Sequence, residues 1–125
     1  MSATHRILIV EDSPTMRQLL VFALKRLKGA AMVEAQDGMD GLRKVSSDHF
    51  DLALIDINMP VMDGLEFVKN VQQIEGAKNT PIVMITTEGG EKHVVEALSL
   101  GAKGYIRKPF TPDQVKEHVV PVLRS

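Results

Sequence analysis

The chain has 125 residues, which suits a single domain with a buried core, and a net charge of -1 gives no electrostatic reason to expect nucleic acid or an anionic membrane as a partner. The absence of Cys excludes disulfides and thiolate metal sites and favours a reducing compartment. The longest apolar run, Leu19 to Leu24, is too short to span a membrane and the polar segment Met1 to Arg6 shows no signal peptide, so we expect a cytoplasmic protein.

The chain begins with a strand pattern followed by a helix pattern. Residues 6–10 form an apolar run that predicts a buried strand, and two acids at 11–12 end it. The Ser-Pro pair at 13–14 is typical of a helix start, because proline at the first helical position loses no hydrogen bond. Apolar residues at helical spacing predict a helix that continues to about Lys28 and stops at Gly29; they are Met16, Leu19, Leu20, Ala23, Leu24 and Leu27.

A weaker strand and a second helix follow. Residues 31–35 predict the strand, and the Asp-Gly turn at 37–38 leads into the helix. Its apolar residues are expected to face the core; they are Met39, Leu42 and Val45.

Residues 51–57 form the central strand pattern. This strand is apolar on both faces, which suits the middle of a parallel sheet covered by helices on each side, and it carries Asp56 near its end. Residues 58–60 break the pattern, and Asp63 is expected to cap a third helix. The apolar residues of that helix are Leu65, Val68, Val71 and Ile74.

The fourth strand and fourth helix repeat this pattern. Residues 81–85 predict a strand that leads into Thr86 and Thr87. The connector at 88–90 contains two glycines, and Gly101 ends the helix that follows it. The apolar side of that helix is expected to consist of Val94, Ala97 and Leu98.

The chain closes with a short strand and a last helix. Residues 104–107 predict the strand, with Lys108 at its exit, and the Thr-Pro pair at 111–112 repeats the helix-start signal. Pro121 is expected to bend or fray the last turn. The apolar residues of the helix are Val115, Val119 and Val122.

Five strands alternating with five helices predict a doubly wound α/β sandwich with one parallel sheet. In such sheets the carboxyl ends of the strands share one edge, where ligands bind. The polar residues at four strand exits should meet there; they are Glu11, Asp12, Asp56, Thr86 and Lys108. Crowded carboxylates of this kind favour a bound Mg²⁺, and a carboxylate beside a cation, an ammonium and a hydroxyl can accept a phosphoryl group. Asp56 is the central acid and therefore the expected nucleophile.

Four stretches of the chain, residues 7–12, 56–64, 85–87 and 108–110, resemble the receiver domain of a two-component response regulator, and most closely the single-domain chemotaxis type. The resemblance implies a flavodoxin-like (βα)5 three-layer sandwich with strand order 2-1-3-4-5. It also implies that residues 1–125 are one receiver domain without an output domain.

The resemblance also implies a role for each matching site residue. Asp56 would accept a phosphoryl group from a sensor histidine kinase. Mg²⁺ would be bound by Asp12, Asp56 and the backbone carbonyl of Asn58, with Glu11 acting through a water molecule. Lys108 would pair with Asp56 and then with the phosphoryl oxygens. Weak phosphotransfer and autodephosphorylation would be the only enzymatic activities.

A switch follows from the same resemblance. Thr86 would bond the phosphoryl group, Tyr105 would turn inward, and the face formed by the fourth helix, fifth strand and fifth helix would change its preference for a protein target, such as a flagellar motor switch component. The Lys108 to Pro109 peptide would be cis, and the chain would act as a monomer.

The resemblance also implies that three positions tune the signal: Asn58, Thr87 and Glu88. Asn58 and Glu88 match places that modulate the lifetime of the phosphoryl group in receivers, and this polar pair resembles that of the chemotaxis regulators with a short-lived signal. Thr87 is bulkier than the small residue often found at its place in receivers, so we expect it to narrow access to the phosphorylation site. The glycines at 89–90 favour a mobile loop in the unphosphorylated state.

Other functions stay open at this point. A Mg²⁺-dependent phosphatase with an aspartate nucleophile would need an acid where Asn58 stands. A flavodoxin-like electron carrier would need a phosphate loop in place of the acidic residues 11–14. A degenerate receiver that binds without phosphorylation, or a receiver cut from a larger regulator, are further alternatives.

Overall fold

The computed structural model describes residues 5–87 and 91–124, and within them the strands and helices alternate throughout. The strands are β1 (His5–Val10), β2 (Ala30–Ala35), β3 (Leu52–Asp56), β4 (Ile82–Thr86) and β5 (Gly104–Arg107). The helices are α1 (Pro14–Leu24), α2 (Gly38–Ser47), α3 (Gly64–Val71), α4 (Glu91–Ser99) and α5 (Pro112–Arg124).

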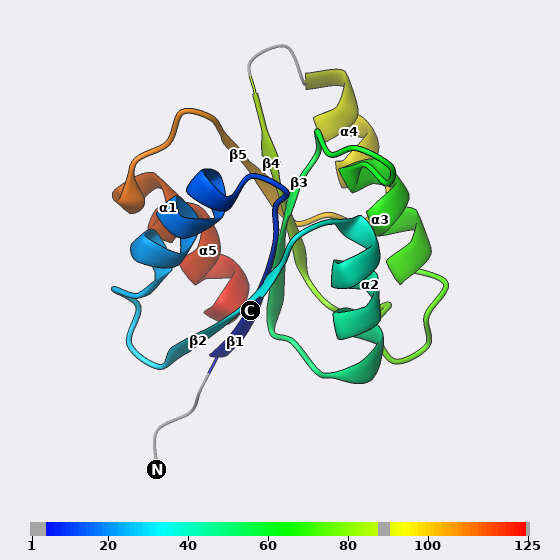
Figure 1. The fold of residues 1–125 in the computed structure, drawn as a ribbon, viewed down its shortest axis with the longest axis horizontal. Helices are drawn as coiled ribbons and strands as arrows, with labels where there is room; N and C mark the ends of the chain where they lie inside the picture. The colour runs from blue at the N-terminus through cyan, green and yellow to red at the C-terminus, as the bar shows by residue number, and fades with distance from the viewer. Residues whose placement is uncertain (1–4, 88–90, 125) are drawn as a thin grey trace.

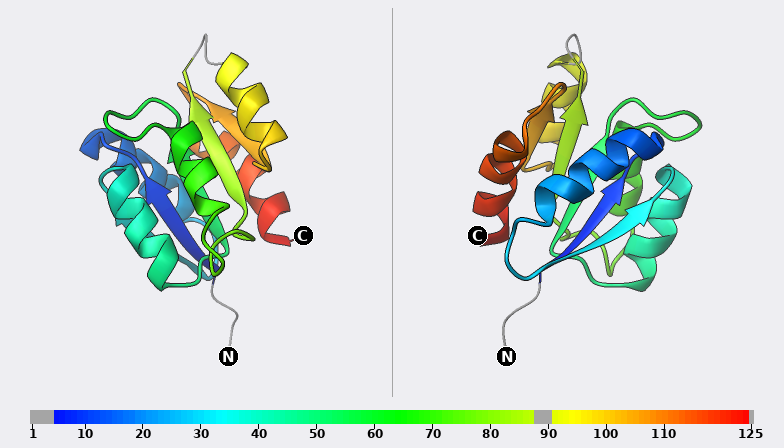
Figure 2. Two further views of the ribbon diagram at one scale, coloured as in Figure 1. Left: turned by 90° about the vertical axis from the view of Figure 1, so that its right-hand side faces the viewer. Right: turned by 60° about the vertical axis from the view of Figure 1, so that its left-hand side comes forward.

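The strands form one parallel sheet in the order β2-β1-β3-β4-β5, which confirms the predicted doubly wound fold. Helices α1 and α5 cover one face of the sheet, and α2, α3 and α4 cover the other (Figure 1). Two further views show the strands running in one direction, so their carboxyl ends lie at the same edge (Figure 2). This edge is where a doubly wound sheet places its ligand site.

The core consists of two apolar layers, one on each face of the sheet. Every residue of the central strands β3 and β4 is buried, as expected for strands covered by helices on both sides. Side chains alternate along β3, so Ala53 and Ile55 belong to one layer and Leu52 and Leu54 to the other. Packing on both faces of the sheet therefore fixes the position of the carboxyl end of β3.

Side chains cap the helices at the predicted positions. The amide of Met16 donates to Ser13 Oγ at 3.3 Å at the start of α1. The amide of Gln114 donates to Thr111 Oγ1 at 3.2 Å, and the amide of Thr111 donates back to Gln114 Oε1 at 2.9 Å. This reciprocal pair is a capping box and fixes the start of α5. Asp63 caps α3 in the same way, since its carboxylate accepts from the amide of Glu66 at 2.9 Å.

Several predicted boundaries are wrong by a few residues. Helix α1 ends at Leu24 rather than near Lys28, because the chain tightens there: the amide of Leu27 bonds the carbonyl of Leu24 at 2.9 Å before Gly29 turns at φ 80°. Helix α3 ends at Val71, so Ile74 lies beyond it, although Ile74 still packs against the core.

Three predicted core residues are exposed: Leu19, Met39 and Leu98. Other residues occupy the inner faces of these helices, such as Leu20 and Leu24 in α1 and Val94 and Ala97 in α4, so the three exposed side chains lie on the outer faces. Helix α5 continues to Arg124 past Pro121, which corrects the predicted fraying. One hydrogen bond lost so near the helix end leaves the earlier turns intact. Within the described residues, no helix is long and apolar enough to cross a membrane.

Candidate functional site

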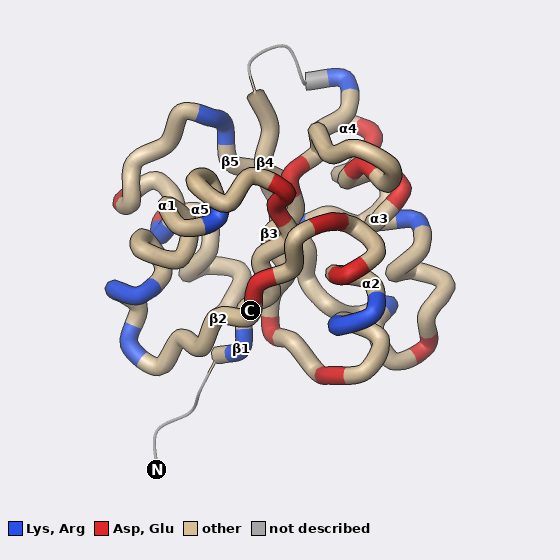
Figure 3. Tube along the Cα trace, viewed as in Figure 1, with Lys and Arg blue, Asp and Glu red and all other residues tan. Residues whose placement is uncertain are grey.

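Three carboxylates gather where β1 and β3 end. Glu11, Asp12 and Asp56 each place an oxygen within 4.8 Å of the others. Strands β1 and β3 are neighbours, and Val10 lies opposite Ile55, so the residues that follow them come to the same place. Figure 3, in which acidic residues are red, shows several acidic segments near the centre of the view, between the labels α1 and α3. The predicted convergence of the first and third strand exits is confirmed by this geometry.

Asp56 is buried, with 2% of its surface exposed, and both of its carboxylate oxygens are bonded. Oδ1 accepts from the amide of Asn58 at 3.0 Å, and Oδ2 accepts from Lys108 Nζ at 3.0 Å. Helix α3 starts directly behind it: a Cβ on Gly64 would lie 2.8 Å from Ile57 Cα and 2.9 Å from the carbonyl oxygen of Asp56. Only glycine lets α3 approach the end of β3 this closely.

Glu11 is as deeply buried as Asp56, with 1% of its surface exposed. Its Oε2 accepts from the amide of Ser13 at 3.1 Å, and its Oε1 accepts from Lys108 Nζ at 3.3 Å. Burial, together with the negative charge of Asp56, raises the pKa of Glu11 from 4.5 to about 7. The neighbouring acid Asp12 is exposed at the mouth of the site.

Lys108 reaches this cluster from the end of β5. Its Nζ lies between Asp56 and Glu11, and its amide donates to the carbonyl of Thr86 at 2.7 Å. Burial lowers the pKa of Lys108, but its hydrogen bond and charge attraction to Asp56, joined by those to Glu11, outweigh this and raise the pKa above 10.5. The peptide bond between Lys108 and Pro109 is cis, as the resemblance implied.

Two threonines and an asparagine line the other side of the site. Thr86 is buried, and its hydroxyl donates to the carbonyl of Thr87 at 3.1 Å. The side-chain amide of Asn58 donates to Thr87 Oγ1 at 3.3 Å, which ties the loop after β3 to the end of β4. Tyr105 is exposed on β5. Glu88 and the glycines at 89–90, for which we predict tuning and mobility, lie outside the described residues.

The residues of this site fit a hard divalent cation. Their available donors are carboxylate and carbonyl oxygens, the ligands that Mg²⁺ prefers. Among the described residues, Lys108 is the cation that pairs with Glu11 and Asp56, so three carboxylates against one ammonium leave the cluster with excess negative charge. Burial first, and the negative charge of Asp56 second, disfavour the ionised form of Glu11. A divalent cation would offset this charge.

The structure adds one residue that the sequence did not suggest. Arg17 Nη1 donates to the carbonyl oxygen of Glu11 at 2.9 Å, and Arg17 Nε donates to Glu34 Oε1 on β2 at 3.0 Å. In the sequence Arg17 is an ordinary charged helix residue, and Glu34 lies 17 positions further on, so no local pattern connects them.

Comparison with known proteins identifies the family. Residues 7–120 match the family described as the response regulator receiver domain. Chemotaxis protein CheY1 of Helicobacter pylori is 43% identical over 119 residues, which cover 94% of this chain and 96% of that protein. CheY-3 of Vibrio cholerae is 39% identical over 112 residues, or 90% of this chain and 86% of that protein.

Solved structures agree with these relatives. Chemotaxis response regulator CheY4 of V. cholerae superposes with a TM-score of 0.87 at 37% identity, covering 96% of this chain and 99% of that one. The receiver domain of a Pseudomonas aeruginosa sensor histidine kinase is described with a magnesium ion in its active site cleft. It superposes with a TM-score of 0.86 at 25% identity, covering 98% of this chain and 100% of that one. This chain therefore belongs to the response regulator receiver domain family and resembles the CheY chemotaxis regulators of two-component systems.

Proposed function

We propose that this chain is a phosphorylation-operated signalling switch in which Asp56 accepts a phosphoryl group from a histidine kinase. The observation that carries the proposal is the setting of Asp56, a carboxylate held at the end of the central strand between the amide of Asn58 and the ammonium of Lys108. This setting fixes the direction of the nucleophilic oxygens before a donor arrives, which lowers the entropic part of the barrier.

Mg²⁺ is the proposed cofactor. Asp12, Asp56 and the backbone carbonyl of Asn58 would hold it, and Glu11 would act through a water molecule. When bound, Mg²⁺ neutralises charge on the transferring phosphoryl oxygens. The three clustered carboxylates support this assignment, as does the magnesium ion described for the related P. aeruginosa receiver domain.

The transfer step needs no further reagent. A carboxylate oxygen of Asp56 forms a bond to phosphorus as the bond from phosphorus to the imidazole nitrogen of the kinase breaks, and the leaving imidazole keeps the electron pair. Lys108 stays protonated throughout, since its pKa is raised. Its ammonium group stabilises the negative charge on the phosphoryl oxygens during the transfer. Attack of water on the acyl phosphate later returns Asp56 and releases phosphate.

Thr86 and Tyr105 are the proposed switch residues. The Thr86 hydroxyl donates to the Thr87 carbonyl, a contact that it must give up in order to bond a phosphoryl group on Asp56. That movement vacates space at the end of β4, beside β5, for the Tyr105 ring. Strands β4 and β5 pair directly, with Met84 opposite Tyr105, so the change passes between adjacent strands.

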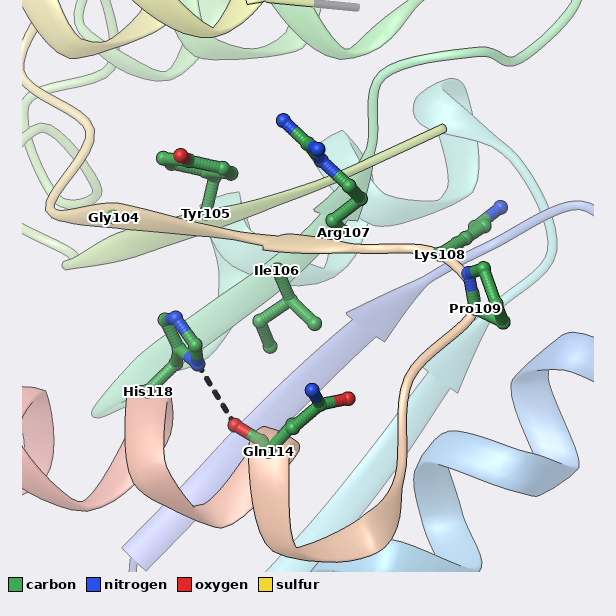
Figure 4. A pocket seen from close by; sticks show the side chains of 8 residues that line it. All are labelled: Gly104, Tyr105, Ile106, Arg107, Lys108, Pro109, Gln114 and His118. Carbon is green, nitrogen blue, oxygen red and sulfur yellow. Dashed lines mark hydrogen bonds between the residues drawn. The ribbon is translucent and has the colours of Figure 1, made fainter. Parts of the chain in front are cut away.

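The proposed target surface is the face formed by α4, β5 and α5. A groove of about 530 Å³ runs along β5 there and is lined by Gly104, Tyr105, Ile106, Arg107, Lys108, Pro109, Gln114 and His118. Tyr105 and Arg107 project from one side of β5, and Ile106 projects from the other toward α5 (Figure 4). A groove that joins the site lysine to the switch tyrosine suits a partner whose binding depends on phosphorylation.

The partner is proposed to be a protein of the chemotaxis pathway, such as a flagellar motor switch component, because the similar curated proteins are chemotaxis regulators. We further propose that this chain acts in the cytoplasm as a monomeric receiver. Receivers of this type are signalling proteins rather than true enzymes.

Intact mass measured after incubation with Mg²⁺ and acetyl phosphate tests the proposal. We expect a gain of one phosphoryl group that requires Mg²⁺, is removed by hydroxylamine and is absent from Asp56→Asn. Absence of any gain, from acetyl phosphate and from a phosphorylated histidine kinase alike, would refute it.

A further inference from the structure

We propose that Arg17 is a positioning residue for Mg²⁺ binding, because its guanidinium holds the peptide bond that joins Glu11 to Asp12. This inference rests on the proposed function, since it concerns the same cation. It assigns a role to a residue of α1 that contributes no oxygen to the site.

Two contacts fix the Arg17 side chain, which is 17% exposed. Nη1 donates to the carbonyl oxygen of Glu11 at 2.9 Å, and Nε donates to Glu34 Oε1 at 3.0 Å. Because the guanidinium is planar and its donors point in fixed directions, two bonds to two different elements determine its orientation. Arg17 therefore joins α1, β2 and the loop after β1.

The orientation of the Glu11 carbonyl determines the position of Asp12. The peptide group is planar, so the direction of this carbonyl sets where the Asp12 backbone lies. The rest of Glu11 is also held, since its amide donates to the carbonyl of Ala35 at 3.1 Å and its carboxylate accepts from Ser13. Asp12 itself is exposed, so backbone geometry rather than packing places its carboxylate.

Glu34 makes a positive charge tolerable so near a cation site. An unpaired guanidinium would repel Mg²⁺, and the Glu34 carboxylate at 3.0 Å offsets that charge. Glu34 is itself held in place: Gln18 Nε2 donates to its Oε1 at 3.0 Å, and Lys44 Nζ donates to its backbone carbonyl at 2.6 Å. Arg17 can thus orient the acidic loop at little electrostatic cost to the cation.

The competing interpretation is an ordinary ion pair between α1 and β2. Partly exposed ion pairs contribute little to stability, and the loss of one would leave cation affinity unchanged. Partners that orient metal ligands behave differently, because their loss weakens metal affinity by roughly 10-fold to 100-fold. Mg²⁺ affinity therefore separates the two interpretations.

The test compares Arg17→Met with Arg43→Met, which removes a guanidinium of α2 that pairs with Asp40 at 3.0 Å and is 70% exposed. The dissociation constant for Mg²⁺ is measured by titration of ¹⁵N-labelled protein, and unfolding in urea is measured without Mg²⁺. We expect Arg17→Met to weaken Mg²⁺ binding by about 10-fold and Arg43→Met to leave it unchanged. Arg17→Lys keeps the charge but cannot span both oxygens, so it should also weaken binding, and it serves if the Met variant fails to fold.

The outcomes distinguish the inference from the function on which it rests. If the wild-type chain binds no Mg²⁺, the proposed function fails. If the wild type binds Mg²⁺ and Arg17→Met or Arg17→Lys binds it equally well, the positioning role is overturned, whatever happens to stability.

Discussion

Replacing Glu11 by Gln should stabilise the Mg²⁺-free protein at alkaline pH and have much less effect at acidic pH. Glu11 is 1% exposed, and burial together with the charge of Asp56 raises its pKa from 4.5 to about 7. A carboxyl group whose pKa is raised by folding binds a proton more tightly in the native state than in the unfolded state. Its contribution to stability is therefore full below pH 4.5 and is lost as the pH rises through about 7.

The magnitude follows from the shift. One pKa unit corresponds to about 1.4 kcal/mol, so the wild-type chain should lose about 2 to 3 kcal/mol from this group between about pH 5 and about pH 8. A Gln side chain keeps the size of Glu and does not titrate. The stability of Glu11→Gln relative to wild type should therefore rise by that amount over the same range.

Urea unfolding in the presence of a chelator, at both pH values, measures the difference. Glu75→Gln is the matched control, because Glu75 has an 89% exposed side chain and its substitution should give the same small effect at each pH. If Glu11→Gln were no more stable than wild type at alkaline pH, neither burial nor the charge of Asp56 would disfavour the ionised form of Glu11 as argued. The argument that a cation offsets the charge of this buried carboxylate would then fail.

Three further predictions concern the loops around the site. Val61 is 92% exposed and has a positive φ of 68°, a backbone conformation that costs a β-branched residue about 1 to 2 kcal/mol. Asn adopts this conformation more readily, so Val61→Asn should raise the urea concentration at the unfolding midpoint. An unchanged or lower midpoint would show that Val61 is not strained. Gly64→Ala should destabilise the fold by about 1 to 3 kcal/mol because its Cβ would meet backbone atoms, whereas Gly76→Ala, which meets nothing within 4 Å, should have little effect; equal losses would refute the packing argument. Thr87→Ala should speed phosphorylation by acetyl phosphate, and Thr87→Val, which keeps the bulk but loses the bond from Asn58, should speed it less if bulk limits access.

The strand ends could be predicted because the relevant signals are local. The strands β1, β3 and β4 contain short apolar runs, and the polar residue at the end of each is visible in the sequence, as with Asp56 after residues 52–55. Parallel strands bring those exits to one edge, which predicts that Asp56 and Lys108 lie on the same side of the sheet. Their direct pairing, observed at 3.0 Å, was implied by the resemblance to receivers. The resemblance to receivers added the strand order and the cis peptide bond, which periodicity could not supply.

Features that depend on competition between neighbours could not be predicted. Met39 in α2 and Leu98 in α4 have the helical spacing of core residues, yet both side chains are exposed. Smaller residues, such as Val45 in α2 and Ala97 in α4, occupy the buried positions of these helices. The end of α1 at Leu24 depends on a tight turn that apolar spacing does not report. The contact of Arg17 with the Glu11 carbonyl joins a side chain to a backbone atom, for which sequence carries no pattern.

The central claim is that phosphorylation of Asp56 changes a distant protein-binding face. The most direct measurement is the amide NMR spectrum of ¹⁵N-labelled protein with Mg²⁺, recorded before and after addition of acetyl phosphate, beside Asp56→Asn. The account predicts shifts at Thr86 and Tyr105 and along α4 and α5, all absent in the variant. Shifts confined to residues in contact with Asp56, with Tyr105 and α5 unchanged, would contradict it.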